Sequence, residues 1–209
     1  MTHTLHRTGT KENLQNDYVV FLMAAQKVNT AGSKEKLQKY LRIAKEYGAV
    51  NIGDGREGCL CDVQDYDWIV DRIKDGVVAH AVFDSQENVS KVLTRLKKED
   101  LGISVVVSGL MEQVGECCKE AGLHPHSVNF SLGVHGRTDK LPPQGPMEIM
   151  TMCGHGMITA DLIYRLVERI QKGTVTATEA ARQLGALCIC GVFNPTRAAA
   201  LLAIMAQEK

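Results

Sequence analysis

The stretch YVVFLMAA, residues 18–25, decides the fold class, because a short and continuous apolar run is typical of a buried strand. Comparable runs follow at 49–52, 77–83 and 103–108, and apolar residues alternate with small or polar ones over 128–134. Met147, Ile149 and Thr151 predict one more strand. Helical periodicity separates these runs over 33–48, 85–98 and 111–121.

This alternation of strands and helices predicts an α/β fold with a layered, partly parallel sheet and flanking helices. Residues 157–209 differ, because they carry a helical apolar stripe, a capping box at Thr176 and Glu179, and an Asn194-Pro195 helix start. We therefore predict a flexible N-terminus over 1–16, an α/β domain over 17–156, and an all-helical C-terminal segment over 157–209 that packs on it.

Composition excludes several classes of protein. The 209 residues carry 24 basic and 24 acidic side chains, and no basic stripe indicates a nucleic-acid partner. No apolar run reaches the length of a membrane span, and the N-terminus lacks the apolar core of a signal peptide. We expect a cytoplasmic protein without a membrane partner. The apolar last helix is either the interface of a homo-oligomer or a helix buried inside the domain.

Seven cysteines are present, an odd number that disfavours a disulfide scaffold in a chain without a secretion signal. Cys117 and Cys118 lie in a predicted helix, where we interpret them as small buried residues. The other five lie in glycine-bearing turns: Cys59, Cys61, Cys153, Cys188 and Cys190. These five are the candidates for catalysis or metal binding.

Cys153 stands in Met152-Cys153-Gly154-His155-Gly156, between a predicted strand and a predicted helix. At the N-terminus of a helix the dipole and free backbone amides favour the thiolate. The motif resembles the active-site cysteine motif of the proline racemase and hydroxyproline epimerase family. That resemblance implies that Cys153 moves a proton at an α-carbon, and that Gly154, His155 and Gly156 hold the substrate carboxylate.

The same family uses a second cysteine, for which Cys188 and Cys190 are the later candidates in this chain. Cys190 precedes the helix that starts at Asn194-Pro195, so two helix N-termini could form an anion pocket with Gly191, Asn194 and Arg197.

A metal centre is the alternative interpretation of these cysteines. The Cys59/Cys61 and Cys188/Cys190 pairs, together with Cys153, suit a 4Fe-4S cluster, because free amides of glycine-rich turns can hydrogen-bond cluster sulfurs. Zinc is the other candidate metal, with His155 or the pair of His124 and His126 as further ligands. The loop from Gly53 to Cys61 would present its charged residues and Cys59 to the site.

The sequence thus predicts a cysteine-dependent enzyme, isomerase- or lyase-like, that acts on a small anionic metabolite by proton transfer or thiol attack. The alternative is an iron–sulfur or zinc protein, catalytic or redox. A third interpretation, a regulatory or assembly domain with structural cysteines, also stays open.

Overall fold

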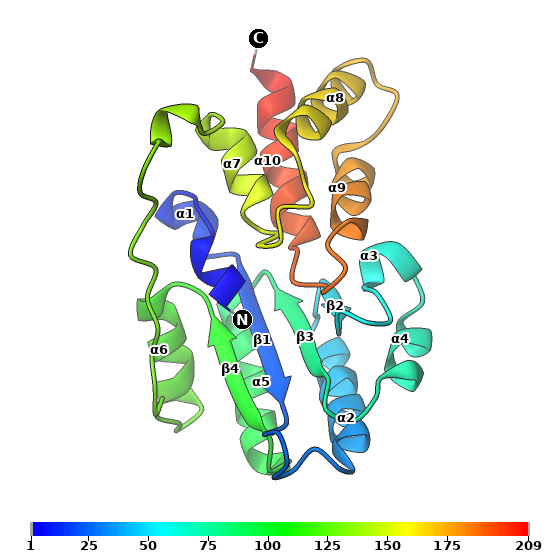
Figure 1. Cartoon of the computed structure of the whole chain (residues 1–209), viewed down its shortest axis with the longest axis vertical. Helices are drawn as coiled ribbons and strands as arrows, with labels where there is room; N and C mark the ends of the chain where they lie inside the picture. Colours follow the sequence, from blue (N-terminus) through cyan, green and yellow to red (C-terminus); the bar gives the residue numbers. More distant parts are fainter. Residues whose placement is uncertain (1, 209) are drawn as a thin grey trace.

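The computed structural model describes residues 2–208 and contains one four-stranded sheet with helices around it (Figure 1). The spatial order of the strands is β2-β3-β1-β4. Their sequences are rich in valine, phenylalanine and other residues that favour a pleated, half-buried surface. The strands are β1 (Tyr18–Met23), β2 (Asn51–Gly53), β3 (Val78–Phe83) and β4 (Ser104–Ser108).

All three strand pairs are antiparallel, so the predicted partly parallel sheet is wrong. The α/β class itself is confirmed at the level of mixed helix and strand. Strands β1 and β2 do run in the same direction, but β3 lies between them and is antiparallel to both. This is a split β-α-β arrangement, in which strand–helix alternation does not place parallel neighbours side by side.

One face of the sheet is covered by α2 (Ser33–Glu46) and α5 (Gln86–Glu99), with α6 (Met111–Glu120) packed against α5 (Figure 1). The Ser85 side chain caps α5 by accepting a hydrogen bond from the backbone N–H of Asn88. Strand β1 alternates, so that Tyr18, Val20 and Leu22 face this helical layer while Val19 and Phe21 face the opposite side.

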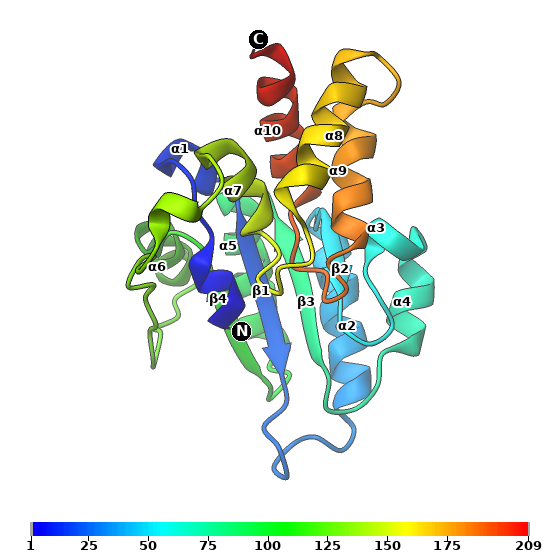
Figure 2. The same cartoon turned by 45° about the horizontal axis from the view of Figure 1, so that its top comes forward.

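The opposite side packs against four helices at one end of the sheet (Figure 2). They are α7 (Gln144–Met150), α8 (Ala160–Gln171), α9 (Ala177–Ala186) and α10 (Pro195–Gln207). The caps predicted at Thr176 and Asn194 are confirmed, since each side chain accepts a hydrogen bond from a backbone N–H in the first turn. The buried apolar residues of α10, Ala198, Leu201 and Leu202, belong to the core that α10 shares with α8 and α9, whereas Ile204 is 53% exposed.

Two predicted strands are absent from the sheet. Residues 147–151 belong to the end of α7 and the turn after it, because three alternating residues are too few to distinguish a strand from a helix. Residues 128–134 are extended but pair with no strand in the part of the chain that the structure describes. Two short helices, α3 (Leu60–Val63) and α4 (Tyr66–Arg72), connect β2 to β3.

The N-terminal segment, which we predicted to be flexible, forms η1 (Thr2–His6) and α1 (Lys11–Leu14) and contacts the body of the protein. Arg7 pairs with the buried Asp17, which also binds Arg197 of α10. Thr8 hydrogen-bonds Thr151 after α7 through its N–H at 3.1 Å. None of the helices between residues 2 and 208 is long and apolar enough to cross a membrane.

Candidate functional site

Three cysteines meet where two turns approach each other near the end of the sheet; we call Cys153, Cys188 and Cys190 the thiol cluster. Cys153 lies in the turn between α7 and α8, and the other two lie between α9 and α10 (Figure 2). The Cys188 and Cys190 sulfurs are 3.8 Å apart, and the Cys188 thiol also hydrogen-bonds Cys153. The three residues are 2%, 0% and 5% exposed respectively for Cys153, Cys188 and Cys190.

Cys153 does not occupy a helix N-terminus, which corrects the prediction. It follows the C-terminal end of α7, and its N–H donates to the carbonyl of Met150 at 3.1 Å, whereas α8 begins only at Ala160 behind the cap Thr159. The error arose because residues 147–151 were predicted as a strand that leads into a helix, whereas they form the end of α7 and the turn after it. Any stabilisation of the Cys153 thiolate therefore has to come from the turn and not from a helix dipole.

The turn and Cys188 supply that stabilisation. The hydrogen bond from the Cys188 thiol, followed by those from the backbone N–H groups of Met157 and His155, lowers the pKa of Cys153 to about 6, against the opposing effects of burial and Cys190. The same contact with Cys153, and then that with Cys190, raises the pKa of Cys188 well above its ordinary value. One thiolate thus lies beside a thiol that keeps its proton.

His155 joins the cluster through Cys190. Its Nδ1 atom lies 3.8 Å from the Cys190 sulfur, and the residue is exposed to solvent. The neighbouring Gly154, Gly156 and Met157 are exposed as well. The cluster therefore lies directly beneath a surface turn, and His155 connects it to water.

Close backbone packing holds the Cys188–Gly191 turn against β2. Gly191 has a φ of 74°, and a Cβ atom there would lie 2.8 Å from the Cα of Gly53. A Cβ atom on Gly53 would lie 3.0 Å from the carbonyl oxygen of Cys190. Only glycine fits at these two positions, so the glycine-rich loop that begins at Gly53 and the cysteine turn fix each other's positions.

Cys59 and Cys61 form a second thiol pair on the other side of the C-terminal end of α9. The Cys59 sulfur donates to the carbonyl of Gly185 at 3.5 Å, and the N–H of Cys188 donates to the same carbonyl at 2.9 Å. The thiol of Cys61, with backbone N–H groups of α3, lowers the pKa of Cys59, and that contact raises the pKa of Cys61. Gly185 leaves room for this pair, since its Cβ would lie 2.6 Å from the Cys61 sulfur.

The five loop cysteines therefore surround one helix end, but they do not form one ligand set. Within residues 2–208, no group of three or more His, Cys, Asp or Glu side chains is arranged to hold a single metal ion. The cysteines predicted as cluster ligands, Cys59, Cys61, Cys153, Cys188 and Cys190, are therefore not gathered around one ion among the described residues.

Three residues of the predicted anion pocket bind or pack against other groups of the protein. Arg197 is buried, binds Asp17 through Nη1 at 2.9 Å and donates from Nη2 to the carbonyl of Thr8 at 2.7 Å. The Asn194 side chain caps α10 and hydrogen-bonds Asp17 at 3.1 Å, and Gly191 is packed against β2. These groups bind or pack against other parts of the protein. Among the residues predicted to bind an anion, Gly154 and Gly156 are exposed.

Two further features were predicted in part or not at all: the sequence gives no sign of a buried arginine network, and it predicts that Asp54 faces the site but not that its carboxylate is buried. The Arg7–Asp17–Arg197 network joins residues far apart in the chain, and no local pattern signals it. Asp54 is buried in the loop after β2, where Oδ1 accepts hydrogen bonds from two backbone N–H groups and Oδ2 has no partner among the described residues. The glycine-rich spacing of that loop points to a tight turn but not to a buried carboxylate.

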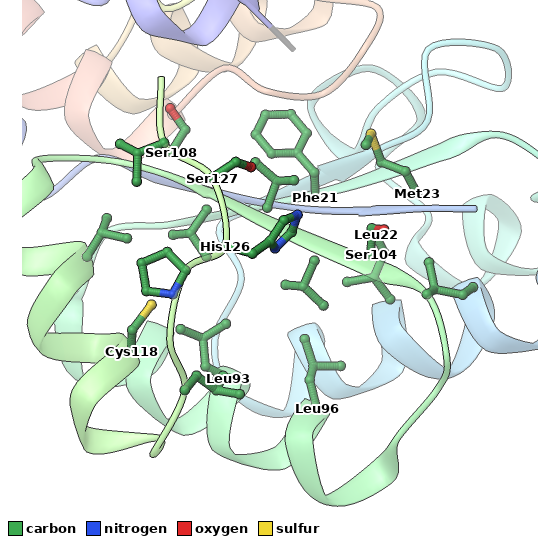
Figure 3. A pocket seen from close by; sticks show the side chains of 18 of the residues that line it. Phe21, Leu22, Met23, Leu93, Leu96, Ser104, Ser108, Cys118, His126 and Ser127 are labelled. Atoms are coloured by element: carbon green, nitrogen blue, oxygen red, sulfur yellow. The ribbon is translucent and has the colours of Figure 1, made fainter. Parts of the chain in front are cut away.

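A large cavity lies away from the thiol cluster. It has a volume of about 1130 Å³ and is lined by β4, α5, α6 and the segment after α6 (Figure 3). Phe21, Leu22 and Leu93 form apolar parts of its wall, and the His126 side chain points into it.

Comparison with known proteins identifies no relative. The chain matches no protein family, no curated protein and no solved structure.

Proposed function

We propose that the protein catalyses thiol–disulfide exchange on a small disulfide substrate, with Cys153 as the nucleophile and Cys188 as the resolving thiol. The contact between these two sulfurs carries the proposal, because a low-pKa thiolate touching a protonated thiol is the arrangement that such exchange needs. Cys190, in contact with Cys188, extends the pair to three thiols.

The exchange proceeds in two displacements. The Cys153 thiolate attacks one sulfur of the substrate, so that a mixed disulfide forms, the substrate S–S bond breaks and its other half leaves as a thiolate. That thiolate takes the proton of Cys188. The new Cys188 thiolate attacks the Cys153 sulfur, forms a Cys153–Cys188 disulfide and releases the second half, which takes a proton from water. The substrate gains the electron pair that the two cysteines lose.

This proposal keeps thiol attack from our sequence prediction and drops the anionic metabolite. Arg197 and Asn194 bind protein groups, and the N–H groups of His155 and Met157 lower the pKa of Cys153 instead of binding a carboxylate. In this proposal the racemase-like motif therefore stabilises the Cys153 thiolate and does not bind the substrate. The exposed side chain of His155 contacts Cys190 at the surface of the cluster.

A disulfide-trapping experiment tests the proposal. The reduced protein is treated with oxidised glutathione, and its disulfides are mapped by mass spectrometry. We expect a Cys153–Cys188 disulfide in the wild type and a glutathione adduct that stays on Cys153 in Cys188→Ser. Cys118→Ser is the matched control, because that cysteine lies in α6 and should leave both products unchanged. A wild type that forms neither product, or oxidises at Cys59 and Cys61 alone, would contradict the proposal.

A zinc or iron–sulfur centre is the second candidate, and one observation favours it. Tetrahedral ligands about 2.3 Å from zinc lie about 3.8 Å apart, and 3.8 Å is also the separation of the Cys188 and Cys190 sulfurs and of the Cys190 sulfur and His155 Nδ1. The side chains would have to rearrange on binding to bring a third ligand to the same ion. Stoichiometric zinc or iron in protein purified without oxygen, and its loss in Cys188→Ser, would support this candidate over thiol exchange.

A further inference from the structure

One guanidinium group joins the two turns that carry the thiol cluster. Arg7 follows η1, and its side chain is only 6% exposed. Its Nη2 atom donates to the carbonyl of Val192 and, at 3.5 Å, to the carbonyl of Met152. Met152 directly precedes Cys153 in the chain, and Val192 directly follows the turn from Cys188 to Gly191. Arg7 therefore binds the backbone beside both parts of the cluster.

Buried groups hold Arg7 in this position. Its Nη1 atom pairs with Asp17, whose fully buried carboxylate also binds Arg197 at 2.9 Å. The carbonyl of the neighbouring Thr8 accepts a hydrogen bond from Arg197 at 2.7 Å, and the N–H of Thr8 donates to the Thr151 hydroxyl at 3.1 Å. Because Arg7 cannot turn away without separating a buried ion pair, its contacts with the two carbonyls are part of the fold.

The direct contacts described between the two turns involve sulfur. The Cys188 thiol hydrogen-bonds Cys153, and the Cys190 sulfur lies 3.8 Å from Nδ1 of His155. A thiol is a weak donor and a weak acceptor. The turns also share an apolar core, but apolar burial is non-directional and does not fix which atoms meet. Arg7 adds a charged donor, whose hydrogen bonds are stronger and directional.

We propose that Arg7 is a positioning residue of the thiol cluster, through which the docked N-terminal segment holds Cys153 against Cys188. When the segment leaves, the two turns lose this connection, and Cys153 loses contact with its thiol partner. The second displacement, in which Cys188 attacks the Cys153 sulfur, then becomes slower. This effect on exchange rests on the proposed function, whereas the effect on the Cys153 thiolate depends only on the contacts of Arg7.

Ultraviolet titration of the Cys153 thiolate tests the positioning role without any substrate. The difference between each protein and its Cys153→Ser counterpart isolates this thiolate. Arg7→Met removes the guanidinium group, so we expect the titration midpoint to move from about 6 towards 9.0. Thr8→Val is the matched control, because it removes only the 3.1 Å contact between the Thr8 and Thr151 hydroxyls and leaves Arg7 in place. It should keep the wild-type midpoint.

Arg7→Lys keeps the test decisive if Arg7→Met does not fold, which circular dichroism melting will show. The lysine ammonium keeps a positive charge beside Asp17, but one nitrogen replaces the two that bind Asp17 and the carbonyls separately. We therefore expect its midpoint to lie above that of the wild type. A wild-type midpoint in Arg7→Lys, or an equal rise in Thr8→Val, would overturn the positioning role.

Oxidised glutathione separates this inference from the proposed function. We expect the Cys153–Cys188 disulfide to form more slowly in Arg7→Lys than in the wild type, and at the wild-type rate in Thr8→Val. A raised midpoint in Arg7→Lys, together with a wild type that forms no such disulfide, would contradict thiol exchange and support the positioning role. A wild-type midpoint in Arg7→Lys, together with normal disulfide formation in the wild type, would overturn the positioning role and leave thiol exchange supported.

Discussion

Replacing Gly191 by alanine should destabilise the protein by more than the backbone conformation alone explains. Gly191 has a φ of 74°, in the left-handed region, where a Cβ atom costs about 1–2 kcal/mol. The added methyl group would also lie 2.8 Å from the Cα and N atoms of Gly53 and from the carbonyl oxygen of Ile52. These are backbone atoms of β2, so the clash cannot be relieved by a side-chain rotation.

Overpacking of this kind adds about 1–3 kcal/mol, which gives a total of about 2–5 kcal/mol for Gly191→Ala. Gly156→Ala is the matched control, because Gly156 has a similar φ of 68° and an alanine Cβ at that position would meet no other atom within 4 Å. It should lose only about 1–2 kcal/mol, the conformational part. Urea unfolding of both variants measures the difference.

The Gly191 substitution should also disturb the thiol cluster, because the same turn carries Cys188 and Cys190. If the turn moves away from Cys153, the hydrogen bond that lowers the pKa of Cys153 weakens, and the thiolate absorbance should titrate at a higher pH than in the wild type. Equal destabilisation by the two glycine substitutions would refute the close approach of the turn to β2. An unchanged titration in a destabilised Gly191→Ala would refute the link from this packing to the cluster.

Further predictions concern the cluster and the buried ion network. Cys188→Ala should raise the pKa of Cys153 from about 6 towards its ordinary value of 9.0, as measured by ultraviolet titration of the thiolate; an unchanged value would show that the backbone amides suffice. Because the folded-state pKa is the lower one, the thiolate's contribution to stability should be complete above pH 9 and disappear as the pH falls through 6. As the pH rises from about 6 to 9, the wild type should therefore gain unfolding free energy relative to Cys153→Ser. A difference that does not change with pH would contradict the low pKa of Cys153. Asp17→Asn removes the carboxylate that binds both Arg7 and Arg197, leaving Arg197 only the longer 3.7 Å contact with Glu148, and should lose about 3–5 kcal/mol. Glu112→Gln, at an exposed ion pair, should leave the urea unfolding midpoint nearly unchanged.

Local signals in the sequence predicted local structure well. The run at 18–25 contains β1, and the caps at Thr176 and Asn194 start α9 and α10 as expected, because each depends on residues within one turn. Strand direction was not predictable in this way. It depends on β3 entering between β1 and β2, and neither the length nor the pattern of the connecting segments encodes that insertion.

The candidate site was predictable in its residue types but not in its contacts. Motif spacing singled out Cys153, Cys188 and Cys190, which the structure brings together. The same reasoning predicted that Arg197 binds an anionic ligand, because the sequence shows no protein partner for a basic residue in the first turn of a helix. Its partner Asp17 lies at the other end of the chain, and only the folded N-terminal segment brings the two together.

The two Cys-x-Cys pairs show how the same spacing acquires different chemistry. In each pair one thiol hydrogen-bonds its neighbour, but Cys61 lies in α3 and, within residues 2–208, the thiol that acts on it is that of Cys59. Cys188 lies in an interhelical turn and is shared between Cys190 and Cys153. Cys188 contacts Cys153 as well as Cys190 for two reasons. Gly53 and Gly191 allow β2 and the Cys188–Gly191 turn to touch, and the end of α7 places Cys153 beside that turn. Reactivity should therefore concentrate at Cys153, and oxidation of Cys59 and Cys61 should leave the thiolate titration of Cys153 unchanged.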